Sequence, residues 1–263
     1  MLLNISEYEE VLNFYEEINK KELLPKRLEI DRDKALFQQT ITKLSELGIL
    51  DKENNEFPLQ VRLLAITTLA KGEPSISQYV GKTWALGYLG IARSGSLVQF
   101  PGERVYYNGK IAEFEGEEVE VLGLRVCGWA KGKLKVLEDY PFEVQQTLLF
   151  YDIATLTGIS LAAMEEAENY AKERVAFGKP IYEFEEVRGF IERGKSFAEG
   201  LKNALILTDN PEKLLHLAIE TAYFCTDKAL QIFGGYGFIN EYPAQKFLRD
   251  ARMLRSLLIR RVQ

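Results

Sequence analysis

The chain has 263 residues, of which 46% are hydrophobic and 27% are charged, and its formal net charge is −6. This composition is ordinary for a folded globular protein, and the negative charge argues against a nucleic-acid partner or an anionic membrane surface. Two cysteines and one histidine exclude a disulfide framework, a histidine-based catalytic triad and most zinc sites, so we expect no metal site.

The first residues lack the basic and apolar run of a signal segment, and no apolar run approaches the ~18 residues that span a bilayer. We therefore expect a cytoplasmic protein without a membrane span. From Ile5 to Arg93 apolar residues recur at helical spacing, and Gly48 stands where a glycine is expected after a last helical turn. This pattern predicts an N-terminal helical domain over residues 1–95.

Between Ser96 and Pro141 the pattern changes to short β-rich runs separated by turn signals. Strands are predicted at 96–100, 104–107, 118–122 and 133–137, and Tyr107-Asn-Gly109 predicts a type I′ hairpin turn. We expect about four to six strands of this size. They form a short β domain over residues 96–142.

From Glu143 to Glu173 apolar residues recur at three- and four-residue steps, which predicts a long helix with one buried face. Gly158 and its small neighbours on this helix favour close approach of another helix. Further helices are predicted at 182–207, from Asn210 (N-cap) and Pro211 to residue 233, and from Pro243 onward. Four antiparallel helices over residues 143–263 predict a bundle.

A glycine cluster, Gly234, Gly235 and Gly237, separates the last two predicted helices. Glycine supplies positive φ and bare backbone, which suit a helix C-cap or the close approach of a ligand. The cluster is not a Rossmann fingerprint, because it follows a helix rather than a strand.

Two segments of the C-terminal half together resemble one enzyme family. Gln231-Ile-Phe-Gly-Gly235, followed by Glu241-Tyr-Pro243 and Arg249-Asp-Ala-Arg252, resembles the C-terminal signature of the acyl-CoA dehydrogenases. Tyr170-Ala-Lys-Glu-Arg-Val-Ala-Phe-Gly-Lys-Pro-Ile181 resembles the family's second signature, in the expected order and separation. The resemblance implies a mainly α fold with a small β insert: an N-terminal helical domain, a reduced middle β domain and a C-terminal four-helix bundle.

The resemblance also implies a flavoprotein oxidoreductase that uses FAD to dehydrogenate an acyl-CoA between its α and β carbons. By the same resemblance, Arg174 and Phe177 contact the FAD of a neighbouring subunit, and Gln231, Gly234 and Gly235 lie along the dinucleotide. A guanidinium binds pyrophosphate oxygens in a bidentate manner. Taken alone, Arg174 has an alternative as a surface ion-pair partner and Gly234 has one as a C-cap.

A site shared between subunits implies a homo-oligomer, either a dimer or a tetramer, or a hetero-oligomer with a related dehydrogenase. Family enzymes remove the substrate α-proton with a glutamate, because the reaction needs a proton acceptor within reach of the α-carbon. This sequence has leucine at both family positions for that glutamate, Leu258 near the C-terminus and Leu148 on the long bundle helix.

Asp152 lies four residues after Leu148 and projects from the same helix face, so it is the substitute base that we name. An exposed or helix-capping aspartate is the alternative interpretation. Two hypotheses for function follow. The first is an acyl-CoA dehydrogenase-like flavoprotein that lacks the usual base, and the second is a non-catalytic homologue that acts as an oligomerisation or FAD/CoA-binding partner subunit.

Overall fold

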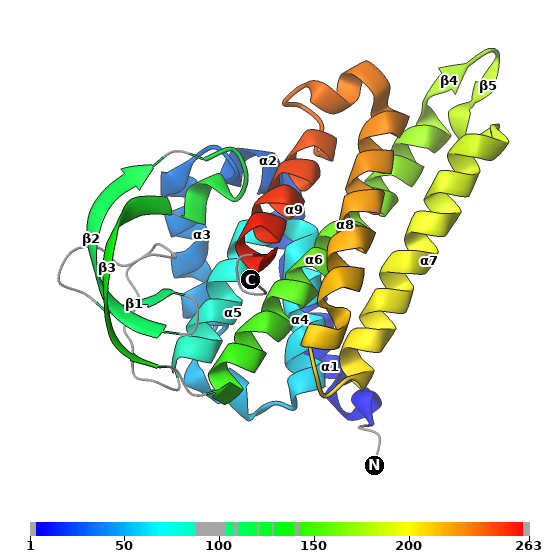
Figure 1. The fold of residues 1–263 in the computed structure, drawn as a ribbon. Coiled ribbons are helices and arrows are strands. Elements are labelled where there is room, and N and C mark those ends of the chain that lie inside the picture. Colours follow the sequence, from blue (N-terminus) through cyan, green and yellow to red (C-terminus); the bar gives the residue numbers. More distant parts are fainter. Residues whose placement is uncertain are drawn as a thin grey trace.

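A computed structural model describes residues 4–87, 104–107, 110–119, 121–127, 129–139 and 142–259, with side chains for 4–85, 121–127 and 142–259. The fold is mainly α with a small β insert, as predicted (Figure 1). The predicted strand at 96–100, the turn residues Asn108 and Gly109, and the proposed domain boundary near residue 95 lie outside the described residues.

The N-terminal region consists of helices, as the apolar spacing predicted. These helices are α1 (Glu9–Ile18), α2 (Arg27–Ile30), α3 (Lys34–Glu46), α4 (Leu59–Gly72) and α5 (Pro74–Gly87), with a π-helical turn at Asn19–Leu23. Gly48 has a φ of 77° and follows the end of α3. Its N–H donates to Ser45, and the N–H of Ile49 donates to Leu44, which is the hydrogen-bond pattern of a Schellman motif. The prediction for Gly48 is confirmed.

The described strands form an antiparallel sheet in the order β1 (Arg104–Tyr107), β2 (Lys110–Val119) and β3 (Trp129–Asp139). The predicted strands at 104–107 and 133–137 are confirmed. The bounds 118–122 were wrong, because β2 begins at Lys110 and ends at Val119.

One feature of β2 explains this error, and a second explains why β2 nevertheless pairs with β3. A register shift between Ile111 and Ala112 breaks the two-residue alternation that marks a strand in sequence. The register also pairs glutamates of β2 with lysines of β3, for example Glu113 with Lys135, and opposite charges in register favour strand pairing.

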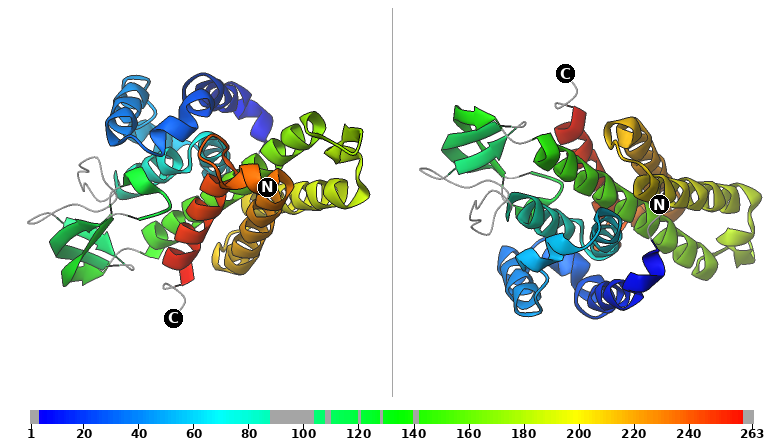
Figure 2. Two further views of the ribbon diagram at one scale, coloured as in Figure 1. Left: turned by 90° about the horizontal axis from the view of Figure 1, so that it is seen from above. Right: turned by 90° about the horizontal axis from the view of Figure 1, so that it is seen from below.

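The C-terminal region is a bundle of long helices: α6 (Phe142–Glu173), α7 (Glu185–Leu207), α8 (Glu212–Phe233) and α9 (Ala244–Ile259). The prediction of four helices here is confirmed. The hairpin of β4 (Val175–Ala176) and β5 (Lys179–Pro180) joins α6 to α7 at the end of the molecule opposite the β1–β3 sheet (Figures 1 and 2). The Asn210 side chain accepts a hydrogen bond of 2.9 Å from the N–H of Glu212, so the predicted cap forms.

Helix α6 lies at the centre of the molecule, with the N-terminal helices on one side and α7 and α8 on the other (Figure 2). A Cβ added at Gly158 of α6 would lie 2.4 Å from the carbonyl oxygen of Thr67 and 2.5 Å from the Cβ of Ala70. Glycine at this position therefore permits the close contact between α6 and α4, in agreement with the prediction of close helix approach.

Within the described residues, α6 has the length and hydropathy of a candidate membrane span, with a mean hydropathy of 1.5 over its most apolar window. Hydroxyl residues and Asp152 interrupt its apolar run, so the sequence shows no continuous apolar stretch of the length of a membrane span. In the structure 94% of this window is buried inside the protein. The apolar character of α6 is therefore used in helix packing within the core.

Candidate functional site

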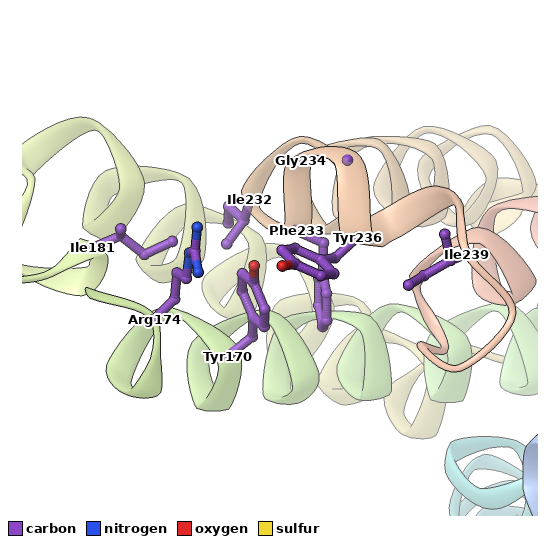
Figure 3. Close-up of a pocket in the computed structure, with 9 residues that line it drawn as sticks. Tyr170, Arg174, Ile181, Ile232, Phe233, Gly234, Tyr236 and Ile239 are labelled. Carbon is purple, nitrogen blue, oxygen red and sulfur yellow. The ribbon is translucent and has the colours of Figure 1, made fainter. Parts of the chain in front are cut away.

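A pocket of about 450 Å³ lies at one end of the bundle, where the last turns of α6 face the end of α8 and the glycine turn after it (Figure 3). Its volume falls within the range of small-molecule sites, roughly 300–1,000 Å³. The lining residues come from α6, from the segment after β5, from α8 and from the turn, and they are Tyr170, Arg174, Ile181, Ile232, Phe233, Gly234, Gly235, Tyr236 and Ile239.

A set of packed aromatic rings forms one wall of this pocket. Tyr170 stacks on Phe233 with 4.2 Å between ring centroids and an interplanar angle of 19°. Tyr242 contacts both rings edge-on, and Tyr236 in turn contacts Tyr242. Partial burial raises the pKa of the Tyr170 hydroxyl, while the nearby Arg174 charge acts in the opposite direction. These contacts fix the ends of α6 and α8 relative to each other.

Arg174 supplies the positive charge of the pocket. Its guanidinium carbon lies 5.6 Å from the centroid of the Tyr236 ring, which is a cation–π arrangement. The side chain is exposed, and Figure 3 shows it lying between Tyr170 and Ile181. An exposed guanidinium beside an aromatic wall suits an anionic ligand that also carries a flat ring system.

The glycine turn supplies the open backbone of the pocket. Gly234 ends α8 with a φ of 57°, as predicted for a glycine C-cap, whereas Gly235 and Gly237 do not have positive φ. No atom lies within 4 Å of a Cβ added at Gly234 or Gly235. Gly237 is instead packed, with a would-be Cβ 2.9 Å from the Leu230 carbonyl oxygen. Gly234 and Gly235 thus leave room for a ligand close to the backbone.

Two residues named for the cofactor lie outside the pocket lining. Phe177 stands at the tip of the β4–β5 hairpin, 97% exposed and with a φ of 52°. Gln231 is exposed on α8, where its amide donates to Asp227 at 2.7 Å and accepts from Lys228 at 3.0 Å. The structure therefore brings Arg174, Gly234 and Gly235 together within one chain, while Phe177 and Gln231 are not among the residues that line this pocket.

Sequence reasoning missed Tyr170 and Tyr236 as pocket residues. Tyr170 precedes Arg174 by four residues and so shares its helix face, which is a signal that the sequence contained. Tyr236 gave no such signal, because its position depends on the turn that follows Gly234.

The two leucines that the sequence resemblance places at the base positions are completely buried. Leu148 of α6 and Leu258 of α9 are each 0% exposed and belong to the hydrophobic core. Neither side chain can accept a proton, and neither position is open to solvent.

Asp152 is 3% exposed in the interior of α6, and its Oδ1 lies 3.8 Å from Lys82 Nζ of α5. The alternative of an exposed or capping aspartate is therefore wrong, because α5 packs over this face of α6. One turn along, Thr155 accepts a hydrogen bond of 3.0 Å from the Gln78 side chain. Asp152 thus belongs to a buried polar contact between the two helices.

The comparisons with known proteins agree with this architecture. The model of the acyl-CoA dehydrogenase C-terminal domain matches residues 216–257, which contain most of α8, the glycine turn and most of α9. A glutaryl-CoA dehydrogenase from Mycobacterium smegmatis in complex with FADH2 superposes with a TM-score of 0.73 over 97% of this chain and 93% of that chain, at 12% identity. The chain therefore has the fold of the acyl-CoA dehydrogenases, and its residues 216–257 match the model of that family's C-terminal domain.

Curated relatives align with a smaller part of the chain. The short-chain specific acyl-CoA dehydrogenase of Megasphaera elsdenii is 32% identical over 111 residues, which are 38% of this chain and 29% of the relative. The caffeyl-CoA reductase-Etf complex subunit CarC of Acetobacterium woodii is 35% identical over 107 residues, 36% of this chain and 28% of the relative. The aligned segment therefore spans less than a third of each of these two relatives.

Proposed function

We propose that this acyl-CoA dehydrogenase-like protein is an FAD-binding partner subunit that does not itself remove a substrate proton. The observation that carries the proposal is the contrast between an open pocket at Arg174, Gly234 and Gly235 and buried leucines at both base positions. The pocket residues fit a dinucleotide: the guanidinium matches pyrophosphate charge, and the two glycines admit a group close to the backbone.

In this proposal the chain's own residues bind and orient. Arg174 neutralises phosphate charge, the bare backbone at Gly234 and Gly235 lets the dinucleotide lie along the turn, and Tyr170 and Tyr236 limit solvent access from one side. Bound FAD would supply hydride acceptance. The buried leucines Leu148 and Leu258 leave the α-proton of an acyl-CoA without the usual acceptor.

We further propose that the site is completed by a second subunit, either a copy of this chain or a related dehydrogenase. Phe177 supports this, because a phenylalanine that is 97% exposed at a hairpin tip has apolar surface to bury. Its neighbour Val175 is 57% exposed. Docking of this hairpin on a partner would bring Phe177 toward the partner's FAD, the role that its signature implies.

A second candidate function is acyl-CoA dehydrogenation with Asp152 as the base. It is supported by the position of Asp152 one helical turn after Leu148 and beside Lys82. For this reaction, the α-proton would pass to the Asp152 carboxylate, so the substrate must enter between α5 and α6.

The colour of the purified protein is the first test of both candidates. A flavoprotein absorbs at about 450 nm, and a colourless protein that also ignores added FAD in a fluorescence titration would refute FAD binding. With FAD bound, we expect no bleaching of that absorbance on anaerobic addition of acyl-CoA. Bleaching that disappears in Asp152→Asn, with flavin content unchanged, would instead establish the second candidate.

A further inference from the structure

Four segments that are far apart in the sequence meet at a buried ion cluster. Lys246 of α9 is 0% exposed, and its Nζ lies 2.5 Å from Asp250 Oδ2, 3.1 Å from Glu73 Oε1 and 4.0 Å from Asp31 Oδ1. Glu73 stands between α4 and α5, and Asp31 follows the end of α2. Arg249 covers the cluster from the surface side and pairs with Asp31 at 2.8 Å.

The cluster also holds the loop Val121–Cys127, which precedes β3, against α9. Asp250 Oδ1 accepts a hydrogen bond of 2.7 Å from the N–H of Leu124, and Arg249 donates to the carbonyl oxygen of Leu122. A Cβ at Gly123 would lie 2.3 Å from the Arg249 carbonyl oxygen, so the loop backbone lies directly on the helix. The protonation and charge of the cluster therefore affect how firmly this loop is attached to α9.

The charges in the cluster do not balance if every group is ionised. Asp31, Glu73 and Asp250 are at most 2% exposed and face one fully buried ammonium, Lys246, and one guanidinium whose side chain is 16% exposed. Lys246 Nζ lies 3.1 Å from Glu73 Oε2 as well, whereas Asp31 Oδ1 has no hydrogen-bond donor among the described residues. An excess buried negative charge is costly, and a proton on one of the three carboxyls removes that excess.

Electrostatics single out Glu73 as the carboxyl that holds the proton. The pKa of Glu73 is raised to about 7, chiefly by burial; Lys246 and the Ser75 N–H act to lower it, and the charges of Asp250 and Asp31 add to the increase. Burial lowers the pKa of Lys246, but the three carboxylates outweigh burial and hold it above its ordinary value. The adjacent Cys127 thiol stays protonated, because burial raises its pKa to about 12.

We propose that Glu73 carries a proton in the folded protein and that its loss above neutral pH loosens the attachment of the loop Val121–Cys127 and of Asp31 to α9. The ionised state leaves three carboxylates against two cations in a buried site. The attachment is firm at mildly acidic pH and weaker at mildly alkaline pH, so the cluster makes the junction between α9, the loop and the N-terminal helices sensitive to pH near neutrality.

The Glu73→Gln variant tests the proposal, because glutamine imitates the protonated side chain. The unfolded chain releases the Glu73 proton near 4.5, and the folded protein releases it near 7. Between these values the wild-type protein loses stability as pH rises, relative to the variant. We expect the ratio of the two unfolding equilibrium constants to change by up to roughly tenfold per pH unit within this window and to be constant above it.

Chemical denaturation at a series of pH values measures that ratio, with Glu46→Gln, an exposed glutamate at the end of α3, as the matched control. The control should show no such window. A second readout is amide exchange at Leu124, which should be faster in the wild type than in Glu73→Gln at pH 8 and equal in the two at pH 5. A ratio that is flat across the window, or that changes in the opposite direction, overturns the proposal.

If Glu73→Gln fails to fold, the wild-type protein still decides the question. Carboxyl carbon NMR of glutamate-labelled protein follows the Glu73 carboxyl directly. A titration midpoint near 7 supports the proposal, and a midpoint near the ordinary value of 4.5 overturns it.

Discussion

Two regions of the bundle differ in solvent exposure and charge: the pocket at one end, and the surroundings of Leu148 and Leu258. The pocket end, where Arg174 meets Gly234 and Gly235, is open, exposed and positively charged. Leu148 and Leu258, which the resemblance predicts to stand at the base positions, are fully buried and apolar. An open charged pocket and a buried apolar region on one scaffold are independent sites, so each can change without the other.

The largest expected effect is a loss of stability when a carboxylate is introduced at a fully buried position. Leu258→Glu buries a charge without a partner, so we expect the free energy of unfolding to fall by about 3–5 kcal/mol. Urea denaturation at pH 7 measures this loss. Ser256→Glu, on the exposed side of the same helix, is the control and should change stability little. A stable Leu258→Glu protein whose flavin absorbance is bleached by acyl-CoA would show that substrate reaches position 258. That result would contradict the contrast between an open pocket and a closed position 258.

The next effect concerns the charged residue of the open pocket. Arg174→Ala removes a charge-assisted hydrogen-bond donor, so we expect FAD affinity to fall by about 1.5–3 kcal/mol. Flavin fluorescence titration measures the change. Arg188→Ala is the matched control, because Arg188 lies exposed on α7 and pairs with Glu192 at 3.8 Å. Equal FAD affinity in Arg174→Ala and wild type would remove this pocket from the cofactor site.

The smallest expected effect is on stability at the glycine turn. It distinguishes the contribution of backbone conformation from that of the room available for a side chain. Gly234 and Gly235 both have open space around a would-be Cβ, but only Gly234 has a positive φ, of 57°. Gly234 also has a ψ of −134°, a conformation that side chains rarely adopt, so Gly234→Ala should lower stability by about 1–3 kcal/mol, whereas Gly235→Ala should leave it nearly unchanged. Thermal unfolding of the two variants compares them, and equal losses would show that φ at Gly234 does not set the shape of the turn.

The sequence by itself determined the parts of this protein whose cause is local. Helical spacing predicted a helix at 143–173, which is observed as α6 (Phe142–Glu173), and the C-cap at Gly48 followed from glycine chemistry after a last turn. The signature around Arg174 predicted the acyl-CoA dehydrogenase fold. Each of these features depends on neighbours within a few residues, which a single sequence displays.

Only the tertiary structure decided which residues meet and which are covered. Arg174 and Gly234 are 60 positions apart and reach one pocket because α6 and α8 pack side by side. Asp152 and Lys246 have charged side chains that local rules place at the surface. Helix α5 covers Asp152, and three distant segments enclose Lys246 on α9. Burial is a property of the segments that cover a residue, so the sequence near that residue does not reveal it.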